Sequence, residues 1–259
     1  MKSYCITLDP SIPSEDFLHF LEGQYQINPI LISEEGELDK IYCTSSQFPE
    51  LSIEGITIEA LNNFNEVNWE EQCKEHCSNF HEGKLLIEVG KYGNFSLKPG
   101  PGFGDLSHPT SQLCLKLLLQ TSPKRSVIDI GSGSGILSFA AAIMGHFPVI
   151  AVEIDPAAME HAKNNSKEID FPYKAPQFLY PHELENTQSD LILINMTQKE
   201  QKAVWTSHKA LFKNSKEIIS SGILIEQKEE YHSFCQTQGW KASSIHQKEK
   251  WMAFTLCQR

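Results

Sequence analysis

Residues 127–137 read Val-Ile-Asp-Ile-Gly-Ser-Gly-Ser-Gly-Ile-Leu, and residues 152–156 read Val-Glu-Ile-Asp-Pro. The first stretch is typical of a buried strand that ends in a glycine turn and continues into an apolar helix. The second ends a further strand with the acid Glu153, and Asp155-Pro156 supplies the residue types that begin a helix. Together the two stretches predict a β-α-β unit of the kind that binds nucleotides.

The spacing of the glycines narrows the class of ligand. Gly131, Gly133 and Gly135 form G-x-G-x-G, whereas a dinucleotide fingerprint places its third glycine one residue later, and no G-x-x-x-x-G-K-[ST] phosphate loop occurs. Asp129 would repel phosphate groups but suits a cation, and Glu153 can accept ribose hydroxyls. These features favour S-adenosylmethionine, which carries a sulfonium and a ribose but no phosphate. A nicotinamide dinucleotide and an incidental glycine turn are the alternatives.

The composition is that of an ordinary globular protein. The 259 residues are 40% hydrophobic and 21% charged, enough for one large or two modest domains with a buried core. The first residues lack the apolar core of a signal peptide, and no apolar run is long enough to cross a bilayer. Seven scattered cysteines favour reduced thiols over a disulfide framework. We therefore expect a cytoplasmic protein without membrane contact.

The acidic charge is concentrated in the first third of the chain. The formal net charge is −11, and residues 1–90 hold 4 lysines against 17 acidic side chains, whereas residues 91–259 hold 18 basic and 16 acidic ones. A solubilising surface is one interpretation. The other is a front module that attracts a basic partner and disfavours bare nucleic acid, whose phosphates it would repel.

Hydrophobic periodicity and turn residues divide the chain into three parts. Residues 1–60 predict a small acidic α+β module of ferredoxin-like type, with strands over 4–8, 29–32, 40–44 and 56–58 and a helix around 17–21. Residues 61–90 predict a linker with a helix that starts after Asn68. Residues 91–259 predict an α/β domain of five β-α units closed by a hairpin, with one antiparallel strand at the edge of a parallel sheet.

Two cysteines of the predicted linker helix raise the question of a metal. Cys73 and Cys77 lie four residues apart, with His76 and His81 nearby. A metal site needs further converging ligands at finger-like spacing, and the sequence shows none. We therefore predict helix-face cysteines and no metal.

Four segments resemble the ribosomal protein L-eleven methyltransferase family (PrmA-like), which belongs to the class I S-adenosylmethionine-dependent methyltransferases. The segments are 101–111 (PGFGDLSHPTS), 127–137, 152–156 and 190–196 (DLILINM). The resemblance covers most of the chain beyond residue 65, while the first 60 residues match only in length and apparent topology. It implies a Rossmann-like, seven-stranded methyltransferase sheet behind the ferredoxin-like module.

Carried over to this sequence, the resemblance implies that Ser111, Gly131, Glu153 and Asn195 contact the methyl donor, and Gly133 lets the backbone approach it. Asn195 would also hold the amine that accepts the methyl group, which makes it the expected catalytic residue. A strand-ending turn residue is the other interpretation of Asn195, and a helix-start residue that of Ser111.

Two aromatic side chains near the donor have structural interpretations as well. For His108, we favour a hydrogen bond that orders its loop over a role as proton acceptor. Trp251 is as suited to core packing in a strand as to stacking along a lysine stem.

One segment departs from the family pattern. The family's Thr-Gly-Thr is Asp105-Leu106-Ser107 here, so that a flexible glycine becomes leucine and a charge enters the loop. This leaves donor binding intact as an expectation but puts loop closure and the identity of the acceptor in question.

The combined interpretation is an S-adenosylmethionine-dependent protein N-methyltransferase. It would act on lysine ε-amines, and on an N-terminal α-amine as a further acceptor, of a basic large-subunit ribosomal protein, as a monomer and without nucleic acid. One alternative is the same chemistry on another protein or a small molecule. The other is a donor-binding module without catalysis, suggested by the departure at 105–107.

Overall fold

The computed structural model describes residues 2–13, 17, 21, 29–35, 38–45, 53, 55–61, 69–184 and 188–258. The chain forms two compact units, residues 1–68 and 69–259. Much of the predicted linker over 61–90 is therefore part of the second unit, because strand β6 (Lys84–Glu88) pairs with β7 (Asn94–Leu97) there. The helix start expected at Asn68 lies outside the described residues.

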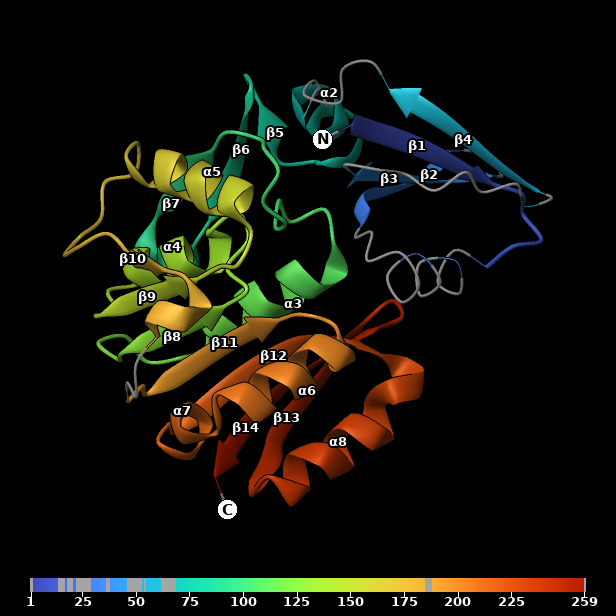
Figure 1. The fold of residues 1–259 in the computed structure, drawn as a ribbon. Helices are drawn as coiled ribbons and strands as arrows, with labels where there is room; N and C mark the ends of the chain where they lie inside the picture. The colour runs from blue at the N-terminus through green and yellow to red at the C-terminus, as the bar shows by residue number, and fades with distance from the viewer. Residues whose placement is uncertain are drawn as a thin grey trace. The chain divides into compact units, whose positions relative to one another are not determined.

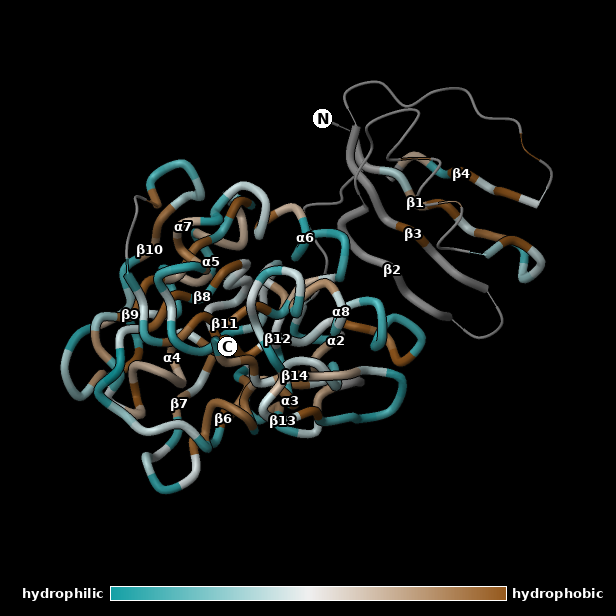
Figure 2. The backbone as a smooth tube through the Cα atoms, turned by 90° about the horizontal axis from the view of Figure 1, so that it is seen from below, coloured by the Kyte–Doolittle hydropathy of each residue, from teal (hydrophilic) through white to brown (hydrophobic). Residues whose placement is uncertain are grey.

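The first unit is an antiparallel sheet of four strands (Figure 1). They are β1 (Lys2–Leu8), β2 (Pro29–Glu35), β3 (Leu38–Ser45) and β4 (Ile56–Leu61), in the order β2-β3-β1-β4. Because β3 pairs between β1 and β2, the sheet has the split arrangement of the expected ferredoxin-like module. Along β4, half-buried Ile56 and Ile58 alternate with exposed Thr57 and Glu59, which is the two-residue period of a half-buried strand. Figure 2 shows hydrophobic and hydrophilic colours changing along β4.

The second unit is built on a seven-stranded sheet in the order β10-β9-β8-β11-β12-β14-β13 (Figure 1). The strands are β8 (Val127–Ile130), β9 (Val149–Val152), β10 (Gln177–Leu179), β11 (Leu191–Asn195), β12 (Glu217–Leu224), β13 (Trp240–Lys248) and β14 (Trp251–Gln258). Strands β8 to β12 pair in parallel with one another, and β14 is antiparallel to both β12 and β13. The expected antiparallel edge strand is thus corrected: β14 inserts beside β12 and leaves β13 at the edge.

Helices cover both faces of this sheet. They are α3 (Pro109–Leu118), α4 (Ile136–Ile143), α5 (Pro156–Ser166), α6 (Gln198–Ser207), α7 (Lys209–Lys213) and α8 (Lys228–Thr237), whereas α2 (Trp69–His76) contacts a smaller sheet. The single helix expected over 198–212 is broken at His208 into α6 and α7. A smaller sheet of β5 (Phe80–His81), β6 and β7 precedes α3. Among the residues described, no helix is long and apolar enough to cross a membrane.

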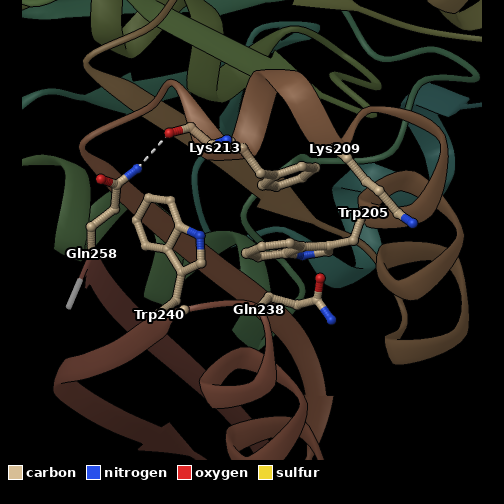
Figure 3. Close-up of a pocket in the computed structure, with 8 residues that line it drawn as sticks. Trp205, Lys209, Lys213, Gln238, Trp240 and Gln258 are labelled. Carbon is tan, nitrogen blue, oxygen red and sulfur yellow. Dashed lines mark hydrogen bonds between the residues drawn. The ribbon is translucent and has the colours of Figure 1, made fainter.

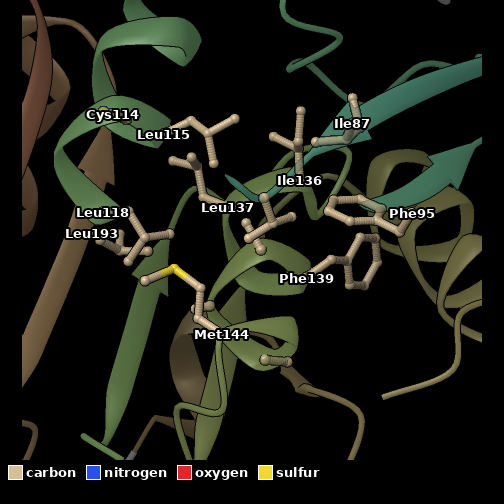
Figure 4. Packing of buried hydrophobic residues seen from close by; sticks show 14 of the residues in the cluster. Ile87, Phe95, Cys114, Leu115, Leu118, Ile136, Leu137, Phe139, Met144 and Leu193 are labelled. Carbon is tan, nitrogen blue, oxygen red and sulfur yellow. The ribbon is translucent and has the colours of Figure 1, made fainter. Parts of the chain in front are cut away.

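The buried strands separate two hydrophobic layers. Leu191 and Leu193 of β11 pack with α3 and α4, in the layer that Figure 4 shows. Ile192 and Ile194 point to the opposite layer, formed with α6, α7 and α8. Such a strand is apolar at every position because both of its faces are covered. This explains why residues 191–194 read as an uninterrupted apolar run and why residues 127–130 are apolar apart from Asp129.

Candidate functional site

Three neighbouring parallel strands end at the same edge of the sheet with the residues singled out from the sequence. Gly131 follows β8, Glu153 follows β9 and Asn195 ends β11. The chain runs outward from β8 through β9 to β10 and then returns to β11 on the other side of β8. Ligands of open α/β sheets bind at the carboxyl ends of the strands beside such a reversal. We call this edge, with Gly131, Gly133, Glu153 and Asn195, the strand-end site.

A loop formed by residues 98–107, here called the covering loop, lies against the glycine turn. Ser134 donates its backbone N–H to the Phe103 carbonyl oxygen at 2.8 Å and its hydroxyl to the Gly104 carbonyl oxygen at 2.6 Å. Asn165 of α5 holds the start of the loop, because its Oδ1 accepts from the Lys98 N–H at 2.8 Å. Contacts distant in sequence therefore fix the backbone above the turn.

Gly133 is required by this contact in two ways. Its φ of +53° is in the left-handed region that side chains disfavour. A Cβ at this position would also overlap the carbonyl oxygen of Phe103. At Gly133, the turn and the covering loop consequently meet backbone to backbone.

The carboxylate of Glu153 is held rigidly at the end of β9. Its Oε2 accepts the Gly133 N–H at 2.8 Å, and its Oε1 accepts the N–H groups of Ile154 at 2.7 Å and Asp155 at 2.9 Å. The residue is 8% exposed. An ionised carboxylate offers about four acceptor positions, and three of them are used here, so about one is left for the ribose.

An unpaired group in the turn supports a polar ligand here. The hydroxyl of Ser132 is buried and lacks a hydrogen-bond partner within the part of the chain that the structure describes. Buried polar groups normally have partners, and an unsatisfied one in a native fold calls for a ligand or an ordered water. Gly133, Glu153 and Ser132 together therefore fit a nucleoside with a polar tail, as S-adenosylmethionine has.

The structure brings Asn195 and Ser111 together, 84 residues apart in sequence. The Asn195 Nδ2 donates to the Ser111 Oγ at 3.4 Å, which leaves the amide oxygen of Asn195 for another donor. Ser111 has no exposed surface and belongs to the first turn of α3. Asn195 is half-buried. Asn195 is thus the side chain of this pair that faces the site edge.

Sequence reasoning missed Gln201, which holds the backbone after Asn195 in place. Its Nε2 donates to the carbonyl oxygens of Met196 and Ser221, both at 2.8 Å. Its Oε1 accepts from the Ser220 hydroxyl at 2.9 Å and the Tyr231 hydroxyl at 2.6 Å. A glutamine inside a helix gives no local signal for such a network, because all four partners but Met196 come from distant segments.

We expect Gln201→Leu to lower the free energy of unfolding by about 3 kcal/mol or more. The substitution keeps an apolar side chain of similar size but leaves buried hydroxyl and carbonyl groups unpaired, at about 1–3 kcal/mol for each group that water cannot reach. Urea unfolding of both proteins measures the difference. The exposed Gln238→Leu change on the loop after α8 serves as the control and should stay within about 0.5 kcal/mol of wild type.

Asp129 does not flank the site as a charge, contrary to expectation. Its carboxyl is 1% exposed and accepts the Ser138 hydroxyl of α4 at 2.6 Å. Burial raises its pKa from 3.8 to about 7, although the hydrogen bonds from Ser138 act in the opposite direction. The acid that suggested a cationic ligand is therefore part of the interior beneath the turn.

This raised pKa predicts a pH-dependent stability that Asp129→Asn removes. Below pH 3.8 the carboxyl is protonated in the folded and the unfolded chain alike. As the pH rises from 3.8 to about 7, only the unfolded chain ionises readily, so the folded chain loses stability, and the loss levels off above about 7. The wild type should lose on the order of 3 kcal/mol relative to Asp129→Asn across this range. Urea unfolding over the range measures it, and the exposed Asp170→Asn should leave the slope unchanged.

His108, which follows the covering loop, makes an ordering hydrogen bond at the start of α3, the kind of role favoured from the sequence. It caps α3 by accepting the Thr110 N–H at its Nδ1, at 3.3 Å. Burial lowers the pKa of His108, although the charge of Asp105 acts in the opposite direction. The ring lies edge-on to Phe103, 5.5 Å between centroids, and to Trp251, 4.9 Å. Trp251 therefore packs on the loop's histidine.

The departure at residues 105–107 has a structural explanation. Leu106 adopts a φ of +68°, the left-handed conformation that a glycine takes without strain. The Asp105 Oδ1 accepts both the N–H of Ser107 at 2.8 Å and its hydroxyl at 2.6 Å. Half-buried Leu106 packs against the main hydrophobic layer. Leu106 thus occupies a backbone conformation suited to glycine, and the hydrogen bonds of Asp105 fix the turn around it.

A cavity of about 450 Å³ lies elsewhere on the second unit (Figure 3). Trp205 of α6, Lys213 of α7, Trp240 and Gln258 contribute to its lining. Trp240 begins β13 and Gln258 ends the antiparallel β14. The cavity is therefore at the amino ends of the parallel strands, away from the strand-end site.

Fold and site together define an α/β nucleoside-binding enzyme of the methyltransferase type. The family model described as Ribosomal protein L11 methyltransferase (PrmA) matches residues 21–259. The chain belongs to this family and is an S-adenosylmethionine-dependent methyltransferase.

Individual relatives agree with this assignment. The Ribosomal protein L11 methyltransferase of Anoxybacillus flavithermus is 28% identical over 260 residues, covering 89% of this chain and 83% of that protein. The protein of the same name from Polynucleobacter necessarius is 35% identical over 159 residues, covering 57% of this chain but only 48% of that protein. The crystal structure of ribosomal protein L11 methylase from Lactobacillus delbrueckii subsp. bulgaricus has the same fold, with a TM-score of 0.56, 19% identity, and coverage of 67% of this chain and 98% of that one.

Proposed function

We propose that this chain transfers methyl groups from S-adenosylmethionine to lysine ε-amines, and to the N-terminal α-amine, of ribosomal protein L11. The observation that carries the proposal is the family match over residues 21–259, together with the meeting of Gly131, Glu153 and Asn195 at one edge of the sheet. Methyl transfer from a sulfonium to an amine is an in-line displacement, so alignment and exclusion of water supply most of the acceleration.

We assign each residue of the strand-end site a role. Glu153 binds the ribose hydroxyls, since its carboxylate is held in place by three backbone N–H groups. Gly131 and Gly133 let the backbone meet the methionine part of the donor. The amide oxygen of Asn195 accepts hydrogens of the incoming amine and points the nitrogen lone pair at the methyl group. Buried Ser111 positions Asn195 through the hydrogen bond to its Nδ2.

The acidic residues 1–60 form the part of the chain that we propose binds the substrate. It lies within residues 1–90, which hold 17 acidic side chains against 4 lysines. Such a surface attracts a basic protein over a Debye length of about 8–10 Å and repels bare nucleic acid. We accordingly propose a cytoplasmic monomer that recognises the ribosomal protein rather than ribosomal RNA.

The test measures donor binding and methyl transfer separately. Calorimetry with S-adenosylmethionine and its demethylated product reports binding, and a radiolabelled methyl group with purified L11 reports transfer. Mass spectrometry then locates the modified amines. We expect both binding and transfer, with label on lysines.

The alternatives give different outcomes. Donor binding without transfer to L11 or to any other ribosomal protein would indicate a module without catalysis. Methyl transfer to a different acceptor would support the proposed reaction but contradict L11 as its substrate. High salt should weaken transfer by raising KM, because it screens the acidic surface.

A further inference from the structure

Two features that the sequence left unexplained meet in the second unit. Cys73 lies on α2 and Cys77 directly follows its last residue, and both are buried. The Cys77 N–H donates to the Cys73 carbonyl oxygen at 2.8 Å, so the helical turn places the two side chains on one face. Asp105 comes from the covering loop, and its Oδ2 accepts a hydrogen bond from the Cys77 Sγ at 3.4 Å. The two sulfurs and a carboxylate oxygen all lie within 4.8 Å of one another. The spacing of the cysteines alone could not show this third group, 28 residues away.

The distances suit ligands of one small cation. Tetrahedral zinc holds thiolate sulfur at about 2.3 Å and carboxylate oxygen at about 2.0–2.2 Å, so its ligand atoms lie about 3.4–3.8 Å apart. Moving from the observed spacing to this one takes about 1 Å or less, within the reach of side-chain rotation. Side chains at positions i and i+4 of a helix lie on the same face, and such pairs commonly bind one metal ion.

The carboxylate is oriented by hydrogen bonds of its own. Its Oδ1 accepts from the N–H and the hydroxyl of Ser107, which leaves Oδ2 facing the sulfurs. The Asp105 carbonyl oxygen accepts from the Asn79 Nδ2 at 3.3 Å. Outer hydrogen bonds of this kind orient the ligands of metal sites.

We propose that Cys73, Cys77 and Asp105 bind one zinc ion, with water in the fourth position. Two thiolates and a carboxylate are donors that zinc accepts, whereas magnesium and calcium prefer oxygen alone. Binding releases two thiol protons to the solvent, so affinity rises with pH.

The ion would join α2 to the covering loop. Asp105 is one residue from Gly104, whose carbonyl oxygen accepts the Ser134 hydroxyl of the glycine turn. Zinc therefore restrains the loop where it lies on the turn. A restrained loop would in turn favour binding of the methyl donor at the strand-end site. That effect on donor binding rests on the proposed function, whereas the metal site itself does not.

Metal titration of the full chain tests the site. The protein is reduced with a phosphine, freed of metal by a chelator and titrated with Co²⁺ as a spectroscopic substitute. We expect one equivalent to produce thiolate-to-metal charge-transfer absorption that one equivalent of Zn²⁺ displaces. Cys73→Ser and Cys77→Ser should lose most of this absorption, and Asp105→Asn should weaken Co²⁺ affinity about tenfold or more.

Matched variants keep the test decisive. Cys257→Ser, on β14, should titrate like the wild type. Asp105→Asn covers the case in which a buried Cys→Ser change prevents folding, because Asp105 is only half-buried. Zn²⁺ should raise the Tm of the wild type and leave that of Asp105→Asn nearly unchanged.

Either of two results would overturn the metal site. One is a wild-type titration without charge-transfer absorption, and the other is an unchanged titration in a folded Cys77→Ser protein. Amide hydrogen exchange of residues 101–107 tests the loop separately, and it should slow when Zn²⁺ is added. Exchange that Zn²⁺ leaves unchanged would overturn the restraint on the loop, whatever the outcome of the methyl-transfer assay.

Discussion

Gly133→Ala is expected to weaken donor binding on the order of 100-fold and to destabilise the second unit by about 3 kcal/mol. A Cβ at a φ of +53° costs about 1–2 kcal/mol. The same Cβ would displace the Phe103 carbonyl, and with it the hydrogen bonds between Ser134 and the covering loop, at about 1 kcal/mol each. Urea unfolding and calorimetry with S-adenosylmethionine measure the two effects.

Gly239→Ala is the matched control for this prediction. Gly239 also has a positive φ, +86°, but nothing lies within 4 Å of the Cβ that would be added. It should share the backbone strain and retain donor affinity. A Gly133→Ala protein that binds the donor like Gly239→Ala would show that contact between turn and covering loop is not needed for binding.

Asn195→Ala is expected to lower kcat about 100-fold with little loss of stability. Without the amide oxygen, the amine loses the group that aligns it, and a misplacement of about 1 Å can cost a factor of this size. The side chain is half-buried and makes one long hydrogen bond to Ser111, so the free energy of unfolding should fall by less than about 1 kcal/mol. Single-turnover methyl transfer and urea unfolding give the two values.

Two further variants separate alignment from packing. Ser111→Ala should lower kcat less than Asn195→Ala does, because it removes only the partner that positions the amide. Asn164→Ala, exposed on α5, should leave transfer unchanged. If Asn195→Ala keeps the wild-type kcat, the residue is a strand-ending turn residue and its catalytic role is excluded.

The sequence predicted those parts of the fold that depend on neighbouring residues. The strands at 127–130, 149–152 and 191–195 are apolar apart from Asp129 and Asn195. The helix that starts at Pro156 has a local signal in its Asp155 cap, which accepts the Ala157 N–H at 2.8 Å. The seven-stranded sheet and the family followed from motifs of this kind. The sequence was misleading about the antiparallel strand at the edge of the sheet. A hairpin at 240–258 can pair with β12 through either of its strands, and the local pattern does not specify which one.

Contacts between distant segments account for what the sequence did not predict. Gln201 satisfies groups on β12 and α8, and Asp105 meets Cys77 across 28 residues. Asp129 was given a charged role because its position after two apolar residues resembles a strand end open to solvent. Only the packing of α4 over it determines its burial, and burial reverses its electrostatics.

The order of folding follows from the way Asn165 and Ser134 hold the covering loop. Residues 127–152 form a compact β-α-β unit whose contacts are short in sequence and close early. The loop is fixed only after chain closures of 30 residues to Ser134 and 67 residues to Asn165, which carry larger entropic costs. A nascent or truncated chain that ends before α5 would therefore lack the Asn165 anchor of Lys98 and would hold its covering loop only through Ser134.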